Sequence, residues 1–431
     1  MKDKSMRSNR IQKLSRRAIL SYGQPISDLM SKALANPSLI SLAAGFVDQE
    51  SLPCEETQEA MRRLTADESA MQQALQYGTT SGYPPLRDAI LDRLKHQDQL
   101  SDDPTLNIDR MVMTAGSNQL LHLVAETLLD PGDIVPCSSP TYFVFMGTLK
   151  NLDVQAEGIE SDEHGMIPEA LADRLEFWRR RGELSRVKAV YVVSYYDNPR
   201  GVSLAHERRQ QLVEVCHRFS VDYPIYILDD MAYRELRYEN DDQPSLLHFD
   251  ESRQHVISTG TFSKSFSPGI RVGWGILPES LVAAVCNQKG NIDFGSPNLN
   301  QHLMHHVIQV GLLDEHIEQI RGVYRTKLES MLEAADRWLA PLADVHWIRP
   351  DGGLYVWVEL PQEVDAGLGS ALFERAMEEG VLYVPGEFCF ADSGVPIRKN
   401  TLRLSFGVQT PKRIAQGVEA LGRAIRDVTD R

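Results

Sequence analysis

One lysine of this chain, Lys264, lies among hydroxyl side chains and between two apolar stretches, within residues 260–275. An arginine, Arg271, follows it seven residues later. A lysine that is desolvated and close to another cation loses its proton more readily, and it then acts as a nucleophile or a base. The segment therefore predicts an amine that forms an imine beside a bound phosphate. An exposed loop lysine is the alternative interpretation.

A second set of donors follows residues 111–113, where Gly116, Ser117 and Asn118 open a predicted helix that runs to Leu129. Free backbone N–H groups and the positive end of the helix dipole favour an anion at such a turn. An ordinary helix cap made by glycine and serine is the alternative. The sequence has neither a GxGxxG nor a Walker A segment, so a dinucleotide or nucleoside triphosphate has little support. Further donors to the same dianion are Thr261, Ser263 and Arg271.

The apolar stretch at residues 225–228 is followed directly by Asp229 and Asp230, with Tyr233 three residues further on. A carboxylate and a phenol at this spacing can lie on the same side of a turn. The carboxylate could hold a ring nitrogen protonated while the phenol donates to a ring oxygen. Helix capping and metal ligation are the alternatives, and we predict no metal because no histidine lies nearby in sequence.

Short β-branched runs alternate with longer amphipathic stretches between residues 111 and 277, which is typical of a parallel sheet covered by helices. Ligands of open α/β sheets bind beyond the carboxyl ends of the strands. We therefore expect Gly116, Asn198, Asp230 and Lys264 to converge on one site. The predicted strands are residues 111–113, 189–193, 225–228, 255–257 and 272–277.

The pattern changes past Gly311, where a long charged helix is predicted over residues 315–340 and strands over residues 353–360 and 401–406. We therefore predict an α/β fold with a large domain, built on a mostly parallel sheet flanked by helices, and a smaller α+β domain. The predicted divisions are residues 1–45 as an N-terminal arm or lid that contributes to the small domain, residues 46–310 as the large domain, and residues 311–431 as the small C-terminal domain.

The 431 residues include 60 acidic and 45 basic side chains, which give a net charge of -15. Nucleic acids and anionic membranes bind basic surfaces, so neither is expected as a partner. The five cysteines form no CxxC pair, which indicates a reducing compartment rather than a disulfide framework. No apolar run is long enough to span a membrane, and the basic first twenty residues lack the apolar core of a signal peptide. We expect a cytoplasmic protein, with a cleaved transit peptide as the alternative.

Taken together with residues 195–201 and 400–406, these motifs resemble those of fold-type I pyridoxal-phosphate enzymes, specifically the class I and II aminotransferases. The resemblance covers residues 40–422 and is closest to the subgroup of aromatic, 2-aminoadipate, kynurenine and valine or alanine transaminases. It implies pyridoxal 5′-phosphate as the cofactor, and it implies small-molecule amino acids and 2-oxo acids as substrates. The implied reaction moves the amino group of an L-amino acid to a 2-oxo acid.

The resemblance also implies a role for each motif residue. Lys264 corresponds to the Schiff-base lysine and proton carrier, and Asp230 to the partner of the pyridine nitrogen. Tyr233 and Asn198 correspond to donors to the ring oxygen O3′, and Tyr142 to the aromatic side chain that stacks on the ring. The phosphate-binding residues that it implies are Ser117, Asn118, Thr261, Ser263 and Arg271.

For the substrate, the resemblance makes Arg403 the clamp for the α-carboxylate, aided by Asn198 and by the backbone of Gly45. A solvent-facing strand arginine is the alternative, because Arg403 alternates with apolar neighbours. Tyr77 resembles the tyrosine that reaches the phosphate of the neighbouring subunit. The resemblance therefore implies a homodimer with shared active sites.

The chain departs from the family pattern in three places. Residues 198–201 read Asn-Pro-Arg-Gly where Asn-Pro-Thr-Gly is usual, and Gly45 is followed by Phe46 and Val47 where Gly-x-Pro is usual. Residues 25–29 lack the arginine that relatives favouring long dicarboxylates carry on the N-terminal helix. This last departure indicates neutral or aromatic amino donors.

Two rival functions remain open at this point. A β-lyase, racemase or synthase could use the same fold and cofactor, because neither determines which bond breaks. A transcriptional regulator could use the domain as a ligand sensor. Only about forty residues precede Leu42, which is too few for a DNA-binding domain and a linker.

Overall fold

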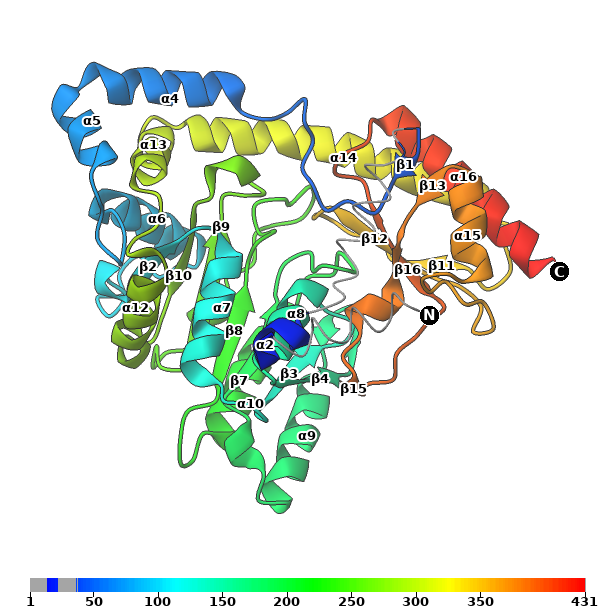
Figure 1. The fold of residues 1–431 in the computed structure, drawn as a ribbon, viewed down its shortest axis with the longest axis horizontal. Coiled ribbons are helices and arrows are strands. Elements are labelled where there is room, and N and C mark those ends of the chain that lie inside the picture. The colour runs from blue at the N-terminus through cyan, green and yellow to red at the C-terminus, as the bar shows by residue number, and fades with distance from the viewer. Residues whose placement is uncertain (1–13, 22–35, 37, 431) are drawn as a thin grey trace.

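The computed structural model describes residues 14–21, 36 and 38–430 of the chain. Its centre is an eight-stranded sheet with the order β15-β4-β3-β7-β8-β9-β10-β2 (Figure 1). All neighbouring strands run parallel except β10, which is antiparallel to both β9 and β2. The strands are β2 (Met111–Thr114), β3 (Ile134–Ser138), β4 (Gln155–Ile159), β7 (Ala189–Val193), β8 (Tyr226–Asp230), β9 (Val256–Thr261), β10 (Gly273–Ile276) and β15 (Ser393–Gly394).

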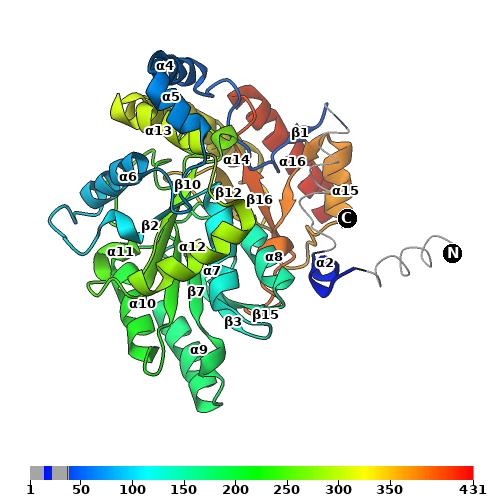
Figure 2. The same cartoon turned by 60° about the vertical axis from the view of Figure 1, so that its left-hand side comes forward.

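Helices cover both faces of this sheet (Figure 2). The chain crosses the sheet in one direction from β2 to β3 to β4, and in the opposite direction from β4 to β7, β8 and β9. Because such crossovers are right-handed, the first set of helices lies on one face and the second set on the other. The first set is α7 (Ser117–Leu128) and α8 (Phe143–Asn151), and the second is α9 (Pro168–Arg180), α10 (His206–Phe219) and α11 (Leu246–Phe249).

Five further helices gather at the β2 end of the sheet, where α13 packs against α4, α5 and α6, and α12 packs against α7. They are α4 (Cys54–Ala66), α5 (Glu68–Leu75), α6 (Pro84–Gln97), α12 (Glu279–Asp293) and α13 (Asn298–Gln309). A short hairpin, β5 (Ser161–Asp162) with β6 (Gly165–Met166), follows β4.

A smaller four-stranded antiparallel sheet, of order β11-β12-β16-β14, lies beside the long helix α14 (Figure 1). Helix α14 spans Leu312–Trp338 and packs along α16, which spans Pro411–Thr429. The remaining elements of this part are β11 (His346–Trp347), β12 (Tyr355–Glu359), β14 (Val384–Pro385), β16 (Thr401–Ser405) and α15 (Ala371–Glu378).

Several segments make contacts across the predicted domain divisions. Strand β1 (Ile40–Ser41) pairs in parallel with β13 (Val381–Leu382), whereas β15, which lies within residues 311–431, joins the large sheet beside β4. The short helix α2 (Arg16–Leu20) packs on α8, and Arg17 donates to the Glu126 carboxylate at 2.8 Å. The divisions at residues 45 and 310 therefore stay predictions, because both the N-terminal and the C-terminal segments contact each part.

Candidate active site

Lys264 lies in the turn that follows β9, at the edge of the sheet where β7 and β8 also end. Its side chain is half-buried, and Nζ donates to the carbonyl oxygen of Gly45 at 2.8 Å. Burial lowers the pKa of Lys264; among its charged neighbours, Tyr355 opposes this effect and Arg403 adds to it. The interpretation as an exposed loop lysine is therefore wrong, and burial favours the neutral amine relative to an exposed lysine.

Arg403, on β16, is 1% exposed, so the interpretation as a solvent-facing arginine is also wrong. Its Nη1 donates to Asn198 Oδ1 at 2.8 Å, and its Nη2 donates to the carbonyl oxygen of Ala43 at 2.7 Å. Among the described residues, Nε of Arg403 has no hydrogen-bond partner although it is buried. A guanidinium that is fixed in this way and keeps a free donor suits a carboxylate ligand.

Tyr355, on β12, contacts Arg403 and also Tyr233, which lies near Lys264. It was not predicted as a site residue. The guanidinium carbon of Arg403 lies 4.3 Å from the centroid of the Tyr355 ring. The Tyr355 hydroxyl lies 3.2 Å from the Tyr233 hydroxyl, and Lys264 Nζ lies 6.0 Å from the centroid of the Tyr233 ring. A Cβ added to Gly45 would lie 2.7 Å from the Tyr355 hydroxyl. Tyr355 thus contacts the predicted site from the smaller sheet.

Asp230 is the last residue of β8 and is buried, as is its neighbour Asp229. Asp230 accepts hydrogen bonds from the Tyr191 hydroxyl at 3.0 Å and from the backbone N–H of Ala232 at 3.2 Å. Asp229 instead accepts from Ser194 and from the backbone N–H of Leu246. Burial raises the pKa of both carboxyl groups to about 6. Because side chains alternate along a strand, the two carboxylates face opposite sides of the sheet.

Tyr142 precedes helix α8, and its hydroxyl donates to Asn118 Oδ1 at 3.5 Å. Asn118 lies in the first turn of α7, next to Ser117. Burial raises the pKa of the Tyr142 phenol, and Asp230, Tyr355 and Arg403 also influence it. Tyr142 therefore lies close to the same set of residues.

The turn before α7 lies against the segment that follows β9. Gly116 has φ of +89°, and a Cβ there would lie 2.8 Å from Nη2 of Arg271. Nη2 of Arg271 donates to the carbonyl oxygen of Ala115 at 2.6 Å. The hydroxyls of Thr261 and Ser263 are hydrogen-bonded to each other at 2.9 Å. The helix N-terminus, the guanidinium and this pair of hydroxyls give the donor types that suit a phosphate.

Tyr77 lies away from these residues, on the outer surface. Its side chain is 82% exposed and packs edge-on against Phe294, with 5.6 Å between the ring centroids. Phe294 is itself 65% exposed, and Leu75 and Ile292 nearby in sequence are also exposed. Tyr77 and Phe294 form an exposed aromatic pair, named here the Tyr77 patch.

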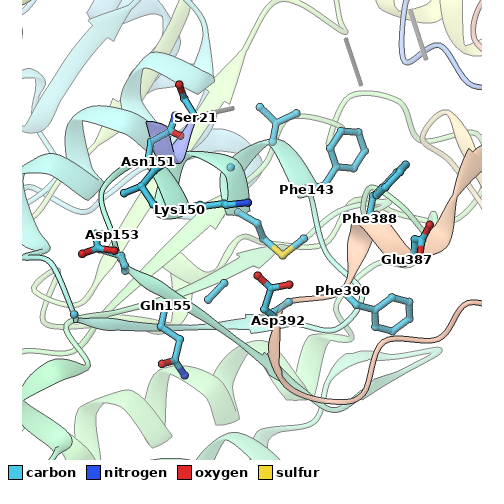
Figure 3. Close-up of a pocket in the computed structure, with 18 of the residues that line it drawn as sticks. Ser21, Phe143, Lys150, Asn151, Asp153, Gln155, Glu387, Phe388, Phe390 and Asp392 are labelled. Atoms are coloured by element: carbon cyan, nitrogen blue, oxygen red, sulfur yellow. The ribbon is translucent and has the colours of Figure 1, made fainter. Parts of the chain in front are cut away.

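A cavity of about 520 Å³ lies beside α8, outside the predicted set of residues. Figure 3 shows Phe143, Phe388 and Phe390 on one side of it and Asp153 and Gln155 on the other. Phe143 also lies 5.6 Å from the guanidinium carbon of Arg403. This ring therefore contacts both the cavity and the predicted carboxylate clamp.

Arg200, which departs from the family pattern, is buried. Its guanidinium pairs with the Asp197 carboxylate at 3.2 Å and donates to the carbonyl oxygen of Asp162 at 2.9 Å. It therefore braces the loop that carries Asn198. Of the other two departures, the one at residues 25–29 lies outside the described residues, and the one after Gly45 begins at the residue whose carbonyl oxygen accepts from Lys264.

Within the described part of the chain, no cluster of three or more histidine, cysteine, aspartate or glutamate side chains could hold a metal ion. None of the helices in this part combines the length and apolar character that a membrane crossing requires.

Comparisons with known proteins agree with this arrangement. Residues 37–421 match the family described as "Aminotransferase class I and II". The chain is 32% identical to an aromatic-amino-acid aminotransferase of Thermococcus litoralis, over 96% of this chain and 94% of that protein. It is also 32% identical to a 2-aminoadipate transaminase of Thermus thermophilus, over 92% of each chain.

Among solved structures, a kynurenine aminotransferase of Pyrococcus horikoshii, determined with PMP, kynurenine and its product, matches with a TM-score of 0.89. Its sequence identity is 30%, over 98% of this chain and 99% of that one. Like this chain, these fold-type I enzymes have a mostly parallel sheet flanked by helices. The chain therefore belongs to the class I and II aminotransferase family, and it is an enzyme that transfers amino groups.

Proposed function

We propose that this aminotransferase binds pyridoxal 5′-phosphate at Lys264 and takes amino groups from neutral or aromatic L-amino acids. The observation that carries the proposal is the arrangement around Lys264. Its amine has a lowered pKa and lies between the Gly45 carbonyl and the Tyr233 ring. Arg403 is held nearby, and its Nε has no hydrogen-bond partner among the residues that the structure describes.

The residues present fit the cofactor at two places. At Gly116 the absence of a Cβ lets the Arg271 guanidinium lie against the N-terminus of α7, and both groups would donate to an anion there. Asp230 is a buried carboxylate without a cation partner among the described residues, and burial raises its pKa to about 6. A protonated ring nitrogen would supply that cation and restore the charged form of Asp230.

When bound, pyridoxal phosphate supplies an electron-accepting ring and a carbon that receives the amino group. Asp230 would hold the proton on the ring nitrogen, and Tyr233 and Asn198 would donate to the ring oxygen. Lys264 would move a proton from the substrate Cα through Nζ. Phosphate donors would come from Ser117, Asn118, Thr261, Ser263 and Arg271, with Tyr142 against the ring.

Arg403 would bind the α-carboxylate of the substrate through its free donor. The groups around its guanidinium are the ring faces of Tyr355 and Phe143, at 4.3 and 5.6 Å. Aromatic and apolar substrate side chains pack well against such rings. This surrounding, together with relatives named for aromatic amino acids and kynurenine, supports neutral or aromatic donors.

We also propose that the active unit is a homodimer in the cytoplasm. The Tyr77 patch exposes two large aromatic side chains that pack on each other, which is typical of a surface covered by a partner. Tyr77 would then reach the phosphate of the neighbouring site. A reducing compartment agrees with five cysteines that are all free.

A transamination screen tests the function. Each of the twenty amino acids is paired with pyruvate and with 2-oxoglutarate, and formation of the new amino acid is measured. We expect ping-pong kinetics and the highest kcat/KM for neutral or aromatic donors. Turnover that needs no 2-oxo acid would instead indicate a lyase or a racemase.

Subunit exchange tests the shared site. We expect a mixture of Lys264→Ala and Tyr77→Ala proteins to recover some activity, because one site of a mixed dimer has both intact residues. Tyr77→Ala must first prove strongly impaired by itself. Mixed dimers that are verified and still inactive would contradict the shared site.

A further inference from the structure

Tyr355 lies where two parts of the predicted site meet, although its own position is in the smaller sheet. Its hydroxyl faces the Tyr233 hydroxyl at 3.2 Å, and the two rings meet edge to face with 5.8 Å between centroids. Its ring face meets the Arg403 guanidinium at 4.3 Å. Tyr355 is 1% exposed, so neither contact competes with bulk water.

We propose that Tyr355 is a positioning residue whose hydroxyl donates to Tyr233 while its ring holds Arg403 in place. This inference rests on the proposed function, in which Tyr233 donates to the cofactor ring oxygen. A hydroxyl has a single proton, so Tyr233 can donate to the cofactor only if its contact with Tyr355 is one that it accepts. Tyr355 must then be the donor.

The direction of these hydrogen bonds has a consequence for the bound cofactor. A donor that itself accepts a hydrogen bond becomes a stronger donor, because the bonds of a chain polarise one another. Tyr355 would therefore strengthen the donation from Tyr233 and favour negative charge on the cofactor's ring oxygen. Burial raises the pKa of Tyr233 well above its ordinary value, so its proton is retained across the working range.

The two contacts of Tyr355 can be separated by Tyr355→Phe, which removes the hydroxyl and keeps the ring against Arg403. The test follows the absorbance of the pyridoxal-phosphate-loaded protein between pH 5 and 10. In Tyr355→Phe, negative charge on the cofactor's ring oxygen should be less favoured. The pH midpoint of the absorbance change should therefore rise by about 0.5 unit, the equivalent of one ordinary hydrogen bond. The KM for the amino donor should change less than twofold.

Tyr383→Phe is a matched control, since Tyr383 is also buried in the smaller part and donates to the carbonyl oxygen of Ala366 at 3.0 Å. It should leave the spectral midpoint unchanged. A second arm compares Tyr233→Phe with the double variant Tyr233→Phe/Tyr355→Phe. The two should have the same midpoint, because Tyr355 acts through Tyr233.

An unshifted midpoint in Tyr355→Phe, or additive shifts in the double variant, would overturn the inference. If Tyr355→Phe does not fold, Tyr355→Leu takes its place. The midpoint shift that it causes should be smaller in the Tyr233→Phe background than in the parent, because part of its effect passes through Tyr233, and equal shifts in the two backgrounds would overturn the inference. The proposed function fails separately, if the parent protein shows no pH-dependent cofactor spectrum at all.

Discussion

Lys264 and Gly45, which are 219 residues apart in the chain, are joined by a hydrogen bond of 2.8 Å from the lysine Nζ to the glycine carbonyl oxygen. The bond brings the segment after β1 against the turn after β9. It gives the amine an acceptor that carries no full charge, and burial lowers the pKa of Lys264.

Asp230→Asn should fold and lose activity by a hundredfold or more, equivalent to about 3 kcal/mol of transition-state stabilisation. A neutral amide cannot hold a proton on the cofactor ring. Asp229→Asn should retain far more activity, because Asp229 faces Ser194 and Leu246 instead. Steady-state kinetics of both variants decide this, and equal losses would mean that the wrong aspartate has been assigned.

Arg403→Lys should raise the KM for amino donors about tenfold or more, since lysine keeps the charge and loses the planar pair of donors. The matched control is Arg398→Lys. Arg398 is exposed and pairs with the Glu359 carboxylate at 2.9 Å, so this variant should keep the parent KM. A KM that does not move in Arg403→Lys would argue against a carboxylate clamp.

Gly116→Ala should weaken cofactor binding, measured by equilibrium dialysis. The backbone there has φ of +89° and ψ of 159°, a region that costs a non-glycine residue about 1–3 kcal/mol, and the methyl group would also displace Arg271. Gly132→Ala is the control, because Gly132 has φ of +92° and no atom within 4 Å of an added Cβ. Equal cofactor affinities of the two variants would contradict an anion site at Gly116.

The stability of the cofactor-free protein should depend on pH through the two buried aspartates. Burial raises the pKa of each to about 6, above the value of about 3.9 in the unfolded chain. The folded state then binds protons more tightly, so stability falls as pH rises from about 4 to about 6 and stays low above that.

Asp230→Asn should therefore stabilise the cofactor-free protein at pH 7.5 by roughly 2–3 kcal/mol, and by only about half as much at pH 5. Urea unfolding at the two pH values measures the difference. Asp102→Asn, at an exposed position, should show no such pH dependence. A gain of the same size at both pH values would mean that charge burial is not its cause.

The β-branched runs predicted the strands that carry the motifs, because Val, Ile and Tyr on both faces of a buried strand leave a clear pattern. Strand β3 was missed because Pro136 interrupts it, and a proline argues against a central strand. Strand β4 reads Gln-Ala-Glu-Gly-Ile and lacks the β-branched signal. Strand β15 is too short to leave any pattern.

Site residues, like the strands, could be predicted only where the sequence has a clear pattern. Polar residues that follow strands, such as Lys264, could be found from the sequence because polarity at such positions is unusual. Tyr191 and Tyr355 lie inside apolar strands, where the pattern predicts that a tyrosine is a core residue. Only the folded chain brings their hydroxyls to Asp230 and Tyr233.

The most direct test of the account is borohydride reduction of the pyridoxal-phosphate-loaded protein, followed by proteolysis and mass spectrometry of the labelled peptide. We expect the cofactor mass on Lys264 and on no other lysine. Lys264→Ala should take up cofactor without covalent label and should have no turnover. A label on another lysine, or full turnover in Lys264→Ala, would contradict the central assignment.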